Sequence, residues 1–94
     1  MILRPPNTRK KRQAPKEWRA VILEACQLPN YAKTGFGYSE VLDIASRHGI
    51  SIGRESLRVK IDRYRRNGYV KKVSRGRFQV PVTGYDFFGA LEHQ

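Results

Sequence analysis

The sequence predicts a small α+β domain in which three helices precede a two-stranded β-hairpin. Apolar residues recur at helical spacing in three separate segments, and proline or glycine marks their boundaries. Residues 69–82 instead alternate apolar and polar side chains around a Ser-Arg-Gly-Arg turn, which is the pattern of a hairpin. At 94 residues, the chain is long enough for one such domain with a modest core.

Residues 1–14 are predicted to form a flexible basic arm, and residues 15–94 the folded domain. The arm contains two prolines and few apolar residues, so it cannot bury enough surface to order itself. A first helix is expected over about 15–28, because Pro15 suits a first helical turn and an apolar stripe follows at Trp18, Val21, Ile22 and Ala25. The Gly-flanked segment YAKTGFG after it is expected to be a loop.

Two further helices are predicted between this loop and the hairpin. Ser39 is a good N-cap candidate for the second helix, and Gly49 is its natural C-terminal stop. The third helix is expected over about 53–67, ending at Asn67-Gly68. Its inward stripe is formed by Leu57, Ile61 and Tyr64.

The hairpin is expected to be a wing of two strands over about 69–82, with one packed face and one outward face. Pairing about Arg75-Gly76 assigns to the packed face Tyr69, Lys71, Val73, Phe78, Val80 and Val82. The outward face then contains Val70, Lys72, Ser74, Arg77, Gln79 and Pro81. Pro81 has no N–H to donate, so its strand is expected to be an edge strand, while Arg75 and Arg77 project from the tip. The aromatic residues Tyr85, Phe87 and Phe88, with Leu91, are expected to fold back on the core as a strand end or short helix.

The formal net charge of +11 is concentrated in two blocks of the sequence. Residues 1–16 carry six Lys or Arg and no acid, and residues 54–77 carry ten Lys or Arg and two acids. The remaining blocks are slightly acidic, so solubility alone does not explain the distribution. We expect a polyanionic partner, and nucleic acid rather than membrane, because no predicted helix pairs a basic face with a deep apolar face.

The turn between the second and third helices has a recognisable chemistry. A small residue, Ala45, lets two helices cross closely, Gly49 permits a left-handed turn, and Ile50 with Ser51 follows. Together with Leu57, Ile61 and the junction Asn67-Gly68-Tyr69-Val70, this pattern resembles the winged helix-turn-helix family of DNA-binding domains over residues 15–84. The resemblance implies that the third helix enters the major groove of double-stranded DNA and that the hairpin meets the backbone or the minor groove.

Helical geometry selects the reading face independently, since the inward stripe leaves the opposite side of the third helix exposed. The candidate DNA-binding residues are Arg54, Glu55, Arg58, Val59, Asp62, Arg63 and Arg66 on this helix, Lys72, Arg75 and Arg77 on the hairpin, and Arg9, Lys10, Lys11 and Arg12 in the arm.

These residues suggest distinct roles. Arg54 and Arg58 are suited to bidentate contacts with guanine. The acids Glu55 and Asp62 either accept from cytosine or hold neighbouring arginines by helical pairing, and we favour the pairing. Val59 is either a contact for a thymine methyl group or a tolerated surface residue. Because acids on this face repel phosphate, some preference for sequence or shape is expected.

The leading functional hypothesis is a small transcription regulator or architectural factor that binds double-stranded DNA. An RNA-binding or ribosome-associated winged domain is the first alternative, since charge alone does not distinguish the two polymers. A protein-interaction module, docking through the hairpin or the aromatic segment, is the second. A homodimer is compatible with each of the three.

Catalysis, cofactors and membrane attachment are not expected. Cys26 is the one cysteine, so the chain has no internal disulfide and no cysteine-based zinc site. His48 and His93 lie far apart, and neither a Gly-rich phosphate loop nor a paired carboxylate motif occurs. The first residues lack the apolar run of a signal peptide, which favours a cytoplasmic, nucleoid-associated protein.

Overall fold

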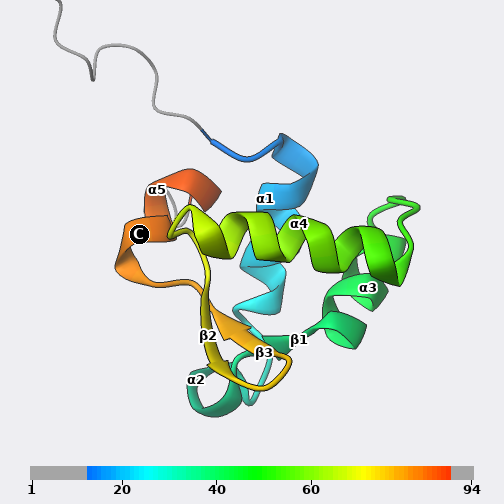
Figure 1. The fold of residues 1–94 in the computed structure, drawn as a ribbon. Helices are drawn as coiled ribbons and strands as arrows, with labels where there is room; N and C mark the ends of the chain where they lie inside the picture. The colour runs from blue at the N-terminus through cyan, green and yellow to red at the C-terminus, as the bar shows by residue number, and fades with distance from the viewer. Residues whose placement is uncertain (1–12, 90–94) are drawn as a thin grey trace, which may run out of the picture.

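The computed structural model of the protein describes residues 13–89, in which helices pack around a three-stranded antiparallel sheet (Figure 1). The sheet order is β1-β3-β2. The elements are α1 (Lys16–Ala25), α2 (Tyr31–Thr34), β1 (Phe36–Gly37), α3 (Tyr38–Arg47), α4 (Arg54–Arg66), β2 (Lys71–Ser74), β3 (Arg77–Gln79), the 3-10 turn η2 (Val82–Gly84) and α5 (Tyr85–Phe88). None of the helices in residues 13–89 is long and apolar enough to cross a membrane.

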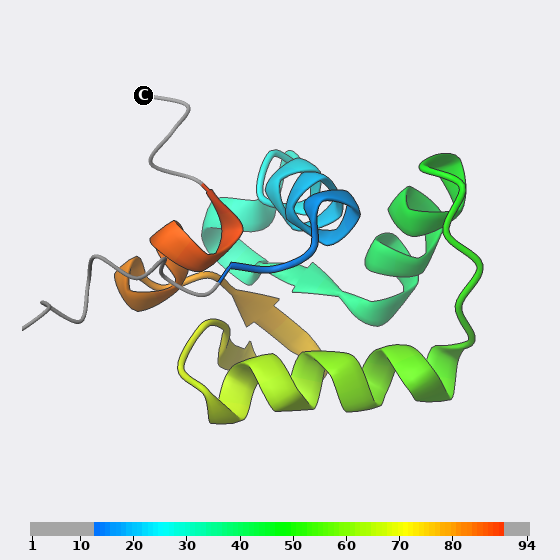
Figure 2. The ribbon, with the colours of Figure 1, turned by 90° about the horizontal axis from the view of Figure 1, so that it is seen from above.

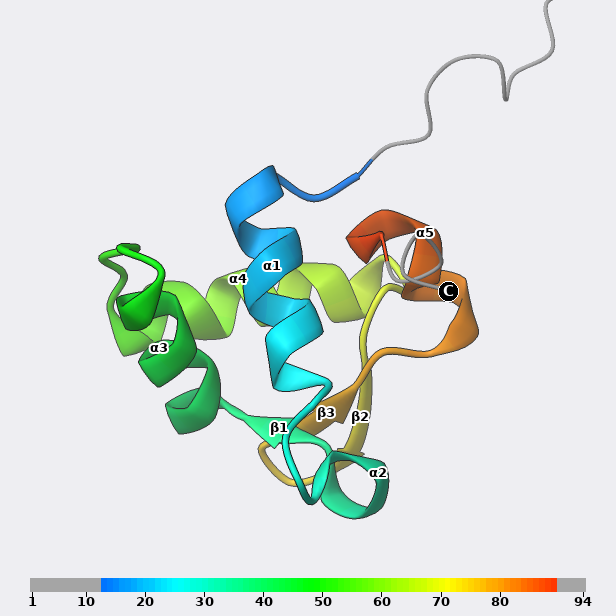
Figure 3. The ribbon, with the colours of Figure 1, turned by 180° about the vertical axis from the view of Figure 1, so that it is seen from behind.

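Three amphipathic helices supply most of the core. Figures 2 and 3 show that α1 and α4 lie on opposite sides of the molecule, so the inward faces of both helices are turned toward its interior. The stripes predicted for the first and third helices are confirmed, because Trp18, Val21, Ile22 and Ala25 of α1 and Leu57, Ile61 and Tyr64 of α4 are buried. Helix α3 adds Val41, Ile44 and Ala45 to the core. Burial of these stripes fixes the outward direction of α4.

Both predicted glycine stops are confirmed. Gly49 and Gly68 have φ of 81° and 83°, the left-handed conformation that glycine adopts without penalty. The N–H of Ile50 donates to the carbonyl of Ala45, and that of Tyr69 donates to the carbonyl of Tyr64. These bonds close a Schellman motif at the end of α3 and of α4, and so set the direction in which the chain leaves each helix.

The segment between α1 and α3 is not the predicted loop. It contains the helical turn α2 and the strand β1, in which Phe36 is fully buried and pairs with Phe78 of β3. The predicted N-cap is also wrong, since α3 begins one residue before Ser39 and Gly37 occupies the cap position. The carboxylate of Glu40 accepts a hydrogen bond of 2.7 Å from the N–H of Gly37, and this bond favours the earlier start.

The predicted faces of the hairpin are confirmed for β3, where Phe78 and, just after the strand, Val80 are buried, but they are wrong for β2. Ser74 pairs with Arg77 as expected, but Val73 forms a bulge, so that Lys72 rather than Val73 pairs with Phe78. One extra residue reverses the alternation of β2, whose side chains are all exposed, while Val70 before it is buried. Val82, predicted to pack, is 74% exposed. The strand β3 is central rather than an edge, and it ends before Pro81.

The C-terminal aromatic residues fold back as η2 and α5, in agreement with the short-helix prediction. Phe87 stacks on Tyr69 with ring centroids 3.8 Å apart, and Phe88 is fully buried. Ala14 is also buried, and its N–H donates to the carbonyl of Phe87. The folded domain therefore begins before residue 15; residues 1–12, with the predicted basic arm, and Leu91 lie outside the described residues.

Candidate nucleic-acid interface

The outward face of α4 is open along its whole length. Figure 2 shows α4 along one side of the molecule, with none of the other described elements on its outer side. Asp62 is partly exposed, and the other predicted reading residues are exposed: Arg54, Glu55, Arg58, Val59, Arg63 and Arg66. Val59 is 55% exposed. The structure therefore brings all seven helix residues of the prediction onto one accessible face.

The two acids on this face hold arginines, as the helical spacing predicts. Asp62 lies 2.7 Å from Arg65 and 2.9 Å from Arg66, and Glu55 lies 3.7 Å from Arg58. The hydrogen bond from Arg65 holds the pKa of the Asp62 carboxyl below its usual range. These pairs orient the long arginine side chains of α4 while leaving the face positive overall.

The tip of the hairpin lies beside the N-terminal half of α4. Between them is an open hollow of about 430 Å³, which we call the α4–hairpin hollow and which is lined by Tyr38, Arg54, Arg58, Lys72, Arg75, Gly76 and Phe78. A second hollow, of about 480 Å³, follows the outward face of α4, and we call it the outer hollow; it is lined by Tyr38, Glu55, Arg58, Val59, Asp62, Arg63 and Arg66. Tyr38 and Arg58 border both hollows, so the two form one continuous basic surface.

Several cations of this basic surface have no acid to neutralise them. Within residues 13–89, no ion pair is formed by Arg54, Arg63, Lys72 or Arg75. Arg47, on α3, provides the contrast, because it pairs with Glu24 at 2.7 Å and with Asp43 at 3.8 Å. Three of these four cations, Arg54, Lys72 and Arg75, lie together where α4 and the hairpin meet, and a group of unneutralised cations favours binding of an anion.

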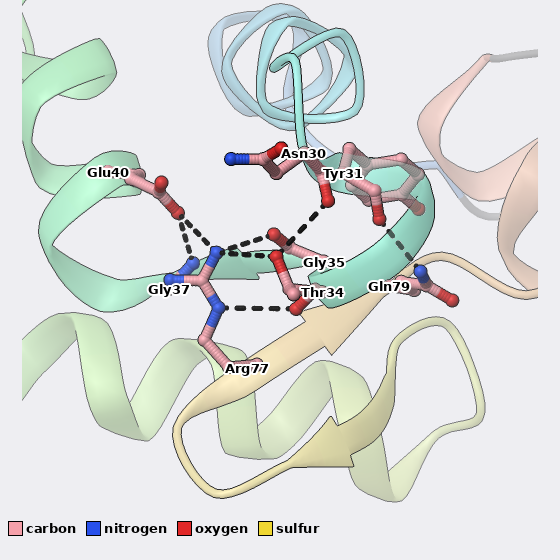
Figure 4. A network of polar contacts seen from close by, with 8 residues as sticks. All are labelled: Asn30, Tyr31, Thr34, Gly35, Gly37, Glu40, Arg77 and Gln79. Carbon is pink, nitrogen blue, oxygen red and sulfur yellow. Dashed lines mark hydrogen bonds and ion pairs between the residues drawn. The ribbon is translucent and has the colours of Figure 1, made fainter.

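Arg77 does not belong to this surface, contrary to the prediction from its place in the turn. Its guanidinium donates to the carbonyl oxygens of Thr34 and Gly35, at 3.2 and 2.7 Å, and pairs with Glu40 at 3.1 Å (Figure 4). A charged group that is satisfied from several sides is a poor donor to an external ligand. Arg77 instead fastens the hairpin to the segment between α2 and α3.

Tyr38 and Lys60 are two residues of this region that the sequence did not single out. Tyr38 borders both hollows, but its position directly after a predicted loop gave no signal. The amino group of Lys60 lies 5.0 Å from the ring centroid of Trp18 and 5.5 Å from that of Tyr64. Burial, and then the nearby charge of Arg63, lowers the pKa of Lys60. In the sequence, Lys60 is one of ten Lys or Arg in residues 54–77, and nothing local distinguishes it from the others.

Comparison with known proteins adds no identity, because the chain matches no protein-family model, no curated protein and no solved structure. Among residues 13–89, no group of three or more His, Cys, Asp or Glu side chains lies close enough to hold a metal ion. Cys26 is half-buried beside the core, and burial raises the pKa of its thiol. The site must therefore be judged from its own geometry and charge.

Proposed function

We propose that the protein binds double-stranded DNA through the basic surface, with α4 in the major groove and the hairpin β2–β3 against the adjacent backbone. The observation that carries this proposal is the α4–hairpin hollow, where Arg54 and Arg58 of the helix meet Lys72 and Arg75 of the hairpin. A single exposed helix about 10–12 Å across matches the major groove in width.

The arrangement of the elements supports a winged helix-turn-helix domain. Helices α3 and α4, joined through the left-handed Gly49, correspond to the helix-turn-helix, and the hairpin corresponds to the wing. The three-stranded antiparallel sheet is compatible with this assignment. On this basis the protein is a small transcription regulator or architectural factor that acts on the nucleoid, with no catalytic role.

The composition of the outer hollow supports a preference for particular sequences or shapes. It combines cations with the exposed Val59 and with Glu55 and Asp62. A binder of phosphate alone gains nothing from acids on its contact face, whereas base edges offer donors, acceptors and thymine methyl groups. Arg58, which borders both hollows, is the residue we assign to base reading, with Glu55 orienting it.

The proposal is tested by measuring affinity for duplexes selected from a random pool, and for scrambled duplexes, at several salt concentrations. With about six to eight phosphate contacts, the plot of log K against log salt should have a slope of roughly −5 to −7. Arg58→Ala should cost about 1–3 kcal/mol on the preferred duplex and reduce discrimination. Arg75→Ala should weaken both duplexes equally and make the slope shallower by about one unit.

Lys33→Ala is the matched control, because it removes one exposed positive charge from α2, outside both hollows. It should leave affinity nearly unchanged. A slope shallower than about −2, or equal losses for Arg75→Ala and Lys33→Ala, would contradict the proposal. Tighter binding to a structured RNA than to any duplex DNA at the same salt would replace DNA with RNA as the partner.

A further inference from the structure

We propose that the α4–hairpin hollow seats one backbone phosphate of the bound nucleic acid, and that the hydroxyl group of Tyr38 is a donor in this seat. This inference rests on the proposed function and divides its surface into two parts. The α4–hairpin hollow would hold the backbone, and the outer hollow would meet the base edges.

The acids of the surface are distributed in a way that supports this division. The lining of the α4–hairpin hollow includes Arg54, Arg58, Lys72 and Arg75 and no Asp or Glu, whereas the outer hollow includes Glu55 and Asp62. A phosphodiester is an acceptor-only anion, so it is favoured where every charged group is a donor. A base edge presents donors as well as acceptors, so it can also use carboxylates. The two hollows thus suit two different parts of one duplex.

Tyr38 is held at the boundary of the seat by neighbours from two other elements. The centroid of its ring lies 5.4 Å from that of Phe78 on β3, and the guanidinium of Arg54 on α4 lies 6.0 Å from the Tyr38 centroid. These contacts restrain the ring before any ligand arrives. Within residues 13–89, the Tyr38 hydroxyl forms no hydrogen bond, so it is available to an incoming acceptor.

The hairpin turn leaves room for a backbone to approach. Gly76, in the lining of the hollow, has φ of 68°, and a Cβ built on it would meet no atom within 4 Å. Lys72 extends from β2 and Arg75 from the turn that follows it, and both are exposed. A phosphate in the hollow could therefore contact cations of the helix and of the hairpin together, which would fix their spacing along the duplex.

The test compares Tyr38→Phe with the wild-type protein on duplexes in which single phosphates are replaced by neutral methylphosphonates. Loss of one hydrogen bond to the anionic phosphate should lower affinity at least about tenfold on matched and scrambled duplexes alike. The salt slope should stay unchanged, because the tyrosine hydroxyl is uncharged. Tyr85→Phe is the control, because Tyr85 lines neither hollow. It should bind as the wild type does.

The methylphosphonate position identifies the seat. One position should weaken the wild-type protein clearly and weaken Tyr38→Phe and Arg54→Ala much less, because the variants have already lost the contact. Circular dichroism checks the fold of each variant. If Tyr38→Phe is unfolded, the methylphosphonate comparison is made between Arg54→Ala and the wild type. The phosphate seat is overturned if every position weakens variant and wild type by the same factor, whereas a wild type without salt-dependent duplex binding overturns the proposed function itself.

Free phosphate is the other source of the same chemistry. Inorganic phosphate, compared with chloride at equal ionic strength, should not weaken duplex binding further. Stronger competition by phosphate in the wild type than in Tyr38→Phe would assign the hollow to a free ion and overturn the backbone assignment.

Discussion

Two arginines on either side of Gly76 show how closely spaced residues of one type acquire different roles. Arg75 is exposed and lines the α4–hairpin hollow, whereas Arg77 donates to the carbonyl oxygens of Thr34 and Gly35 and pairs with Glu40. The carboxylate of Glu40 accepts from the N–H of Gly37 as well as pairing with Arg77. Arg77 is therefore a positioning residue that ties the hairpin to the start of α3.

Arg77→Ala should lower the free energy of unfolding by about 1–3 kcal/mol, because it leaves carbonyl groups and a carboxylate without their charged donor. Arg75→Ala is the matched control from the same turn, and it should change that free energy by less than about 0.5 kcal/mol. Urea unfolding monitored by circular dichroism measures both. Equal costs would show that the contacts in Figure 4 do not stabilise the fold.

Tyr64 should make the protein less stable at alkaline pH. Burial raises the pKa of Tyr64 to about 12, and its hydroxyl has no hydrogen-bond partner among residues 13–89. An unfolded tyrosine has a pKa of about 10, so the folded state holds the proton more tightly. The contribution of the Tyr64 hydroxyl to the free energy of unfolding is complete below pH 10 and is lost as pH rises toward about 12.

Tyr64→Phe should therefore be at least as stable as the wild type at pH 7, and its advantage should grow between about pH 10 and 12. Tyr31→Phe is the contrasting variant, because the N–H of Val80 donates to the Tyr31 hydroxyl at 2.7 Å. It should cost about 1–2 kcal/mol at pH 7, since that N–H loses its acceptor. Chemical unfolding across this pH range tests both variants, and a Tyr64→Phe advantage that shrinks with pH would contradict the assignment.

At the scale of elements, α4 joins the core to the basic surface. Its inward residues Leu57, Ile61 and Tyr64 are buried, while Val59 and four arginines are exposed on its outward side. The Schellman motif at its end directs the chain into β2, so the conformation of Gly68 determines where the hairpin begins.

Gly68→Ala should destabilise the protein by about 1 kcal/mol, because φ of 83° is strained for any residue with a Cβ. Gly53→Ala is the matched control. A Cβ at either glycine would meet no atom within 4 Å, but φ of Gly53 is −83°, so left-handed strain is absent there. Gly53 is the N-cap of α4, so the control should have only the cost of an alanine N-cap, about 0.5 kcal/mol. Thermal unfolding distinguishes the two, and equal effects would rule out strain as the cause.

At the scale of the whole molecule, the folded domain is completed by the segment that precedes α1. Gln13 donates to the carbonyl of Asp86 and accepts from Arg19, and Ala14 is bonded to Phe87. A truncation that preserves these contacts must therefore keep Gln13.

Removal of residues 1–12 should leave the free energy of unfolding within about 0.5 kcal/mol of the wild-type value. Duplex binding should weaken, and its salt dependence should become shallower, because this segment carries five Lys or Arg. Urea unfolding and salt-dependent titration are the two measurements. A strongly destabilised truncation would mean that the segment contributes to the core.

The sequence by itself determined the three apolar stripes, the two glycine stops, the return of the aromatic segment and the concentration of charge in residues 54–77. Each depends on local properties: a helical period of 3.6 residues, the steric freedom of glycine, and composition. The acid–arginine pairs on α4 are likewise separated by three or four residues, so helical spacing alone predicted them.

Only the tertiary structure decided the features that join distant parts of the chain. The strand β1 exists because Phe36 pairs with Phe78, and two residues are too few to show a strand period. A bulge at Val73 reversed the predicted faces of β2, since a shift of one residue turns every side chain of a strand over. Arg77 does not join the basic surface, because its guanidinium contacts acceptors at residues 34, 35 and 40. Tyr38 does lie on that surface, where it contacts Arg54 and Phe78. Contacts across such distances depend on how the elements pack, which no local pattern records.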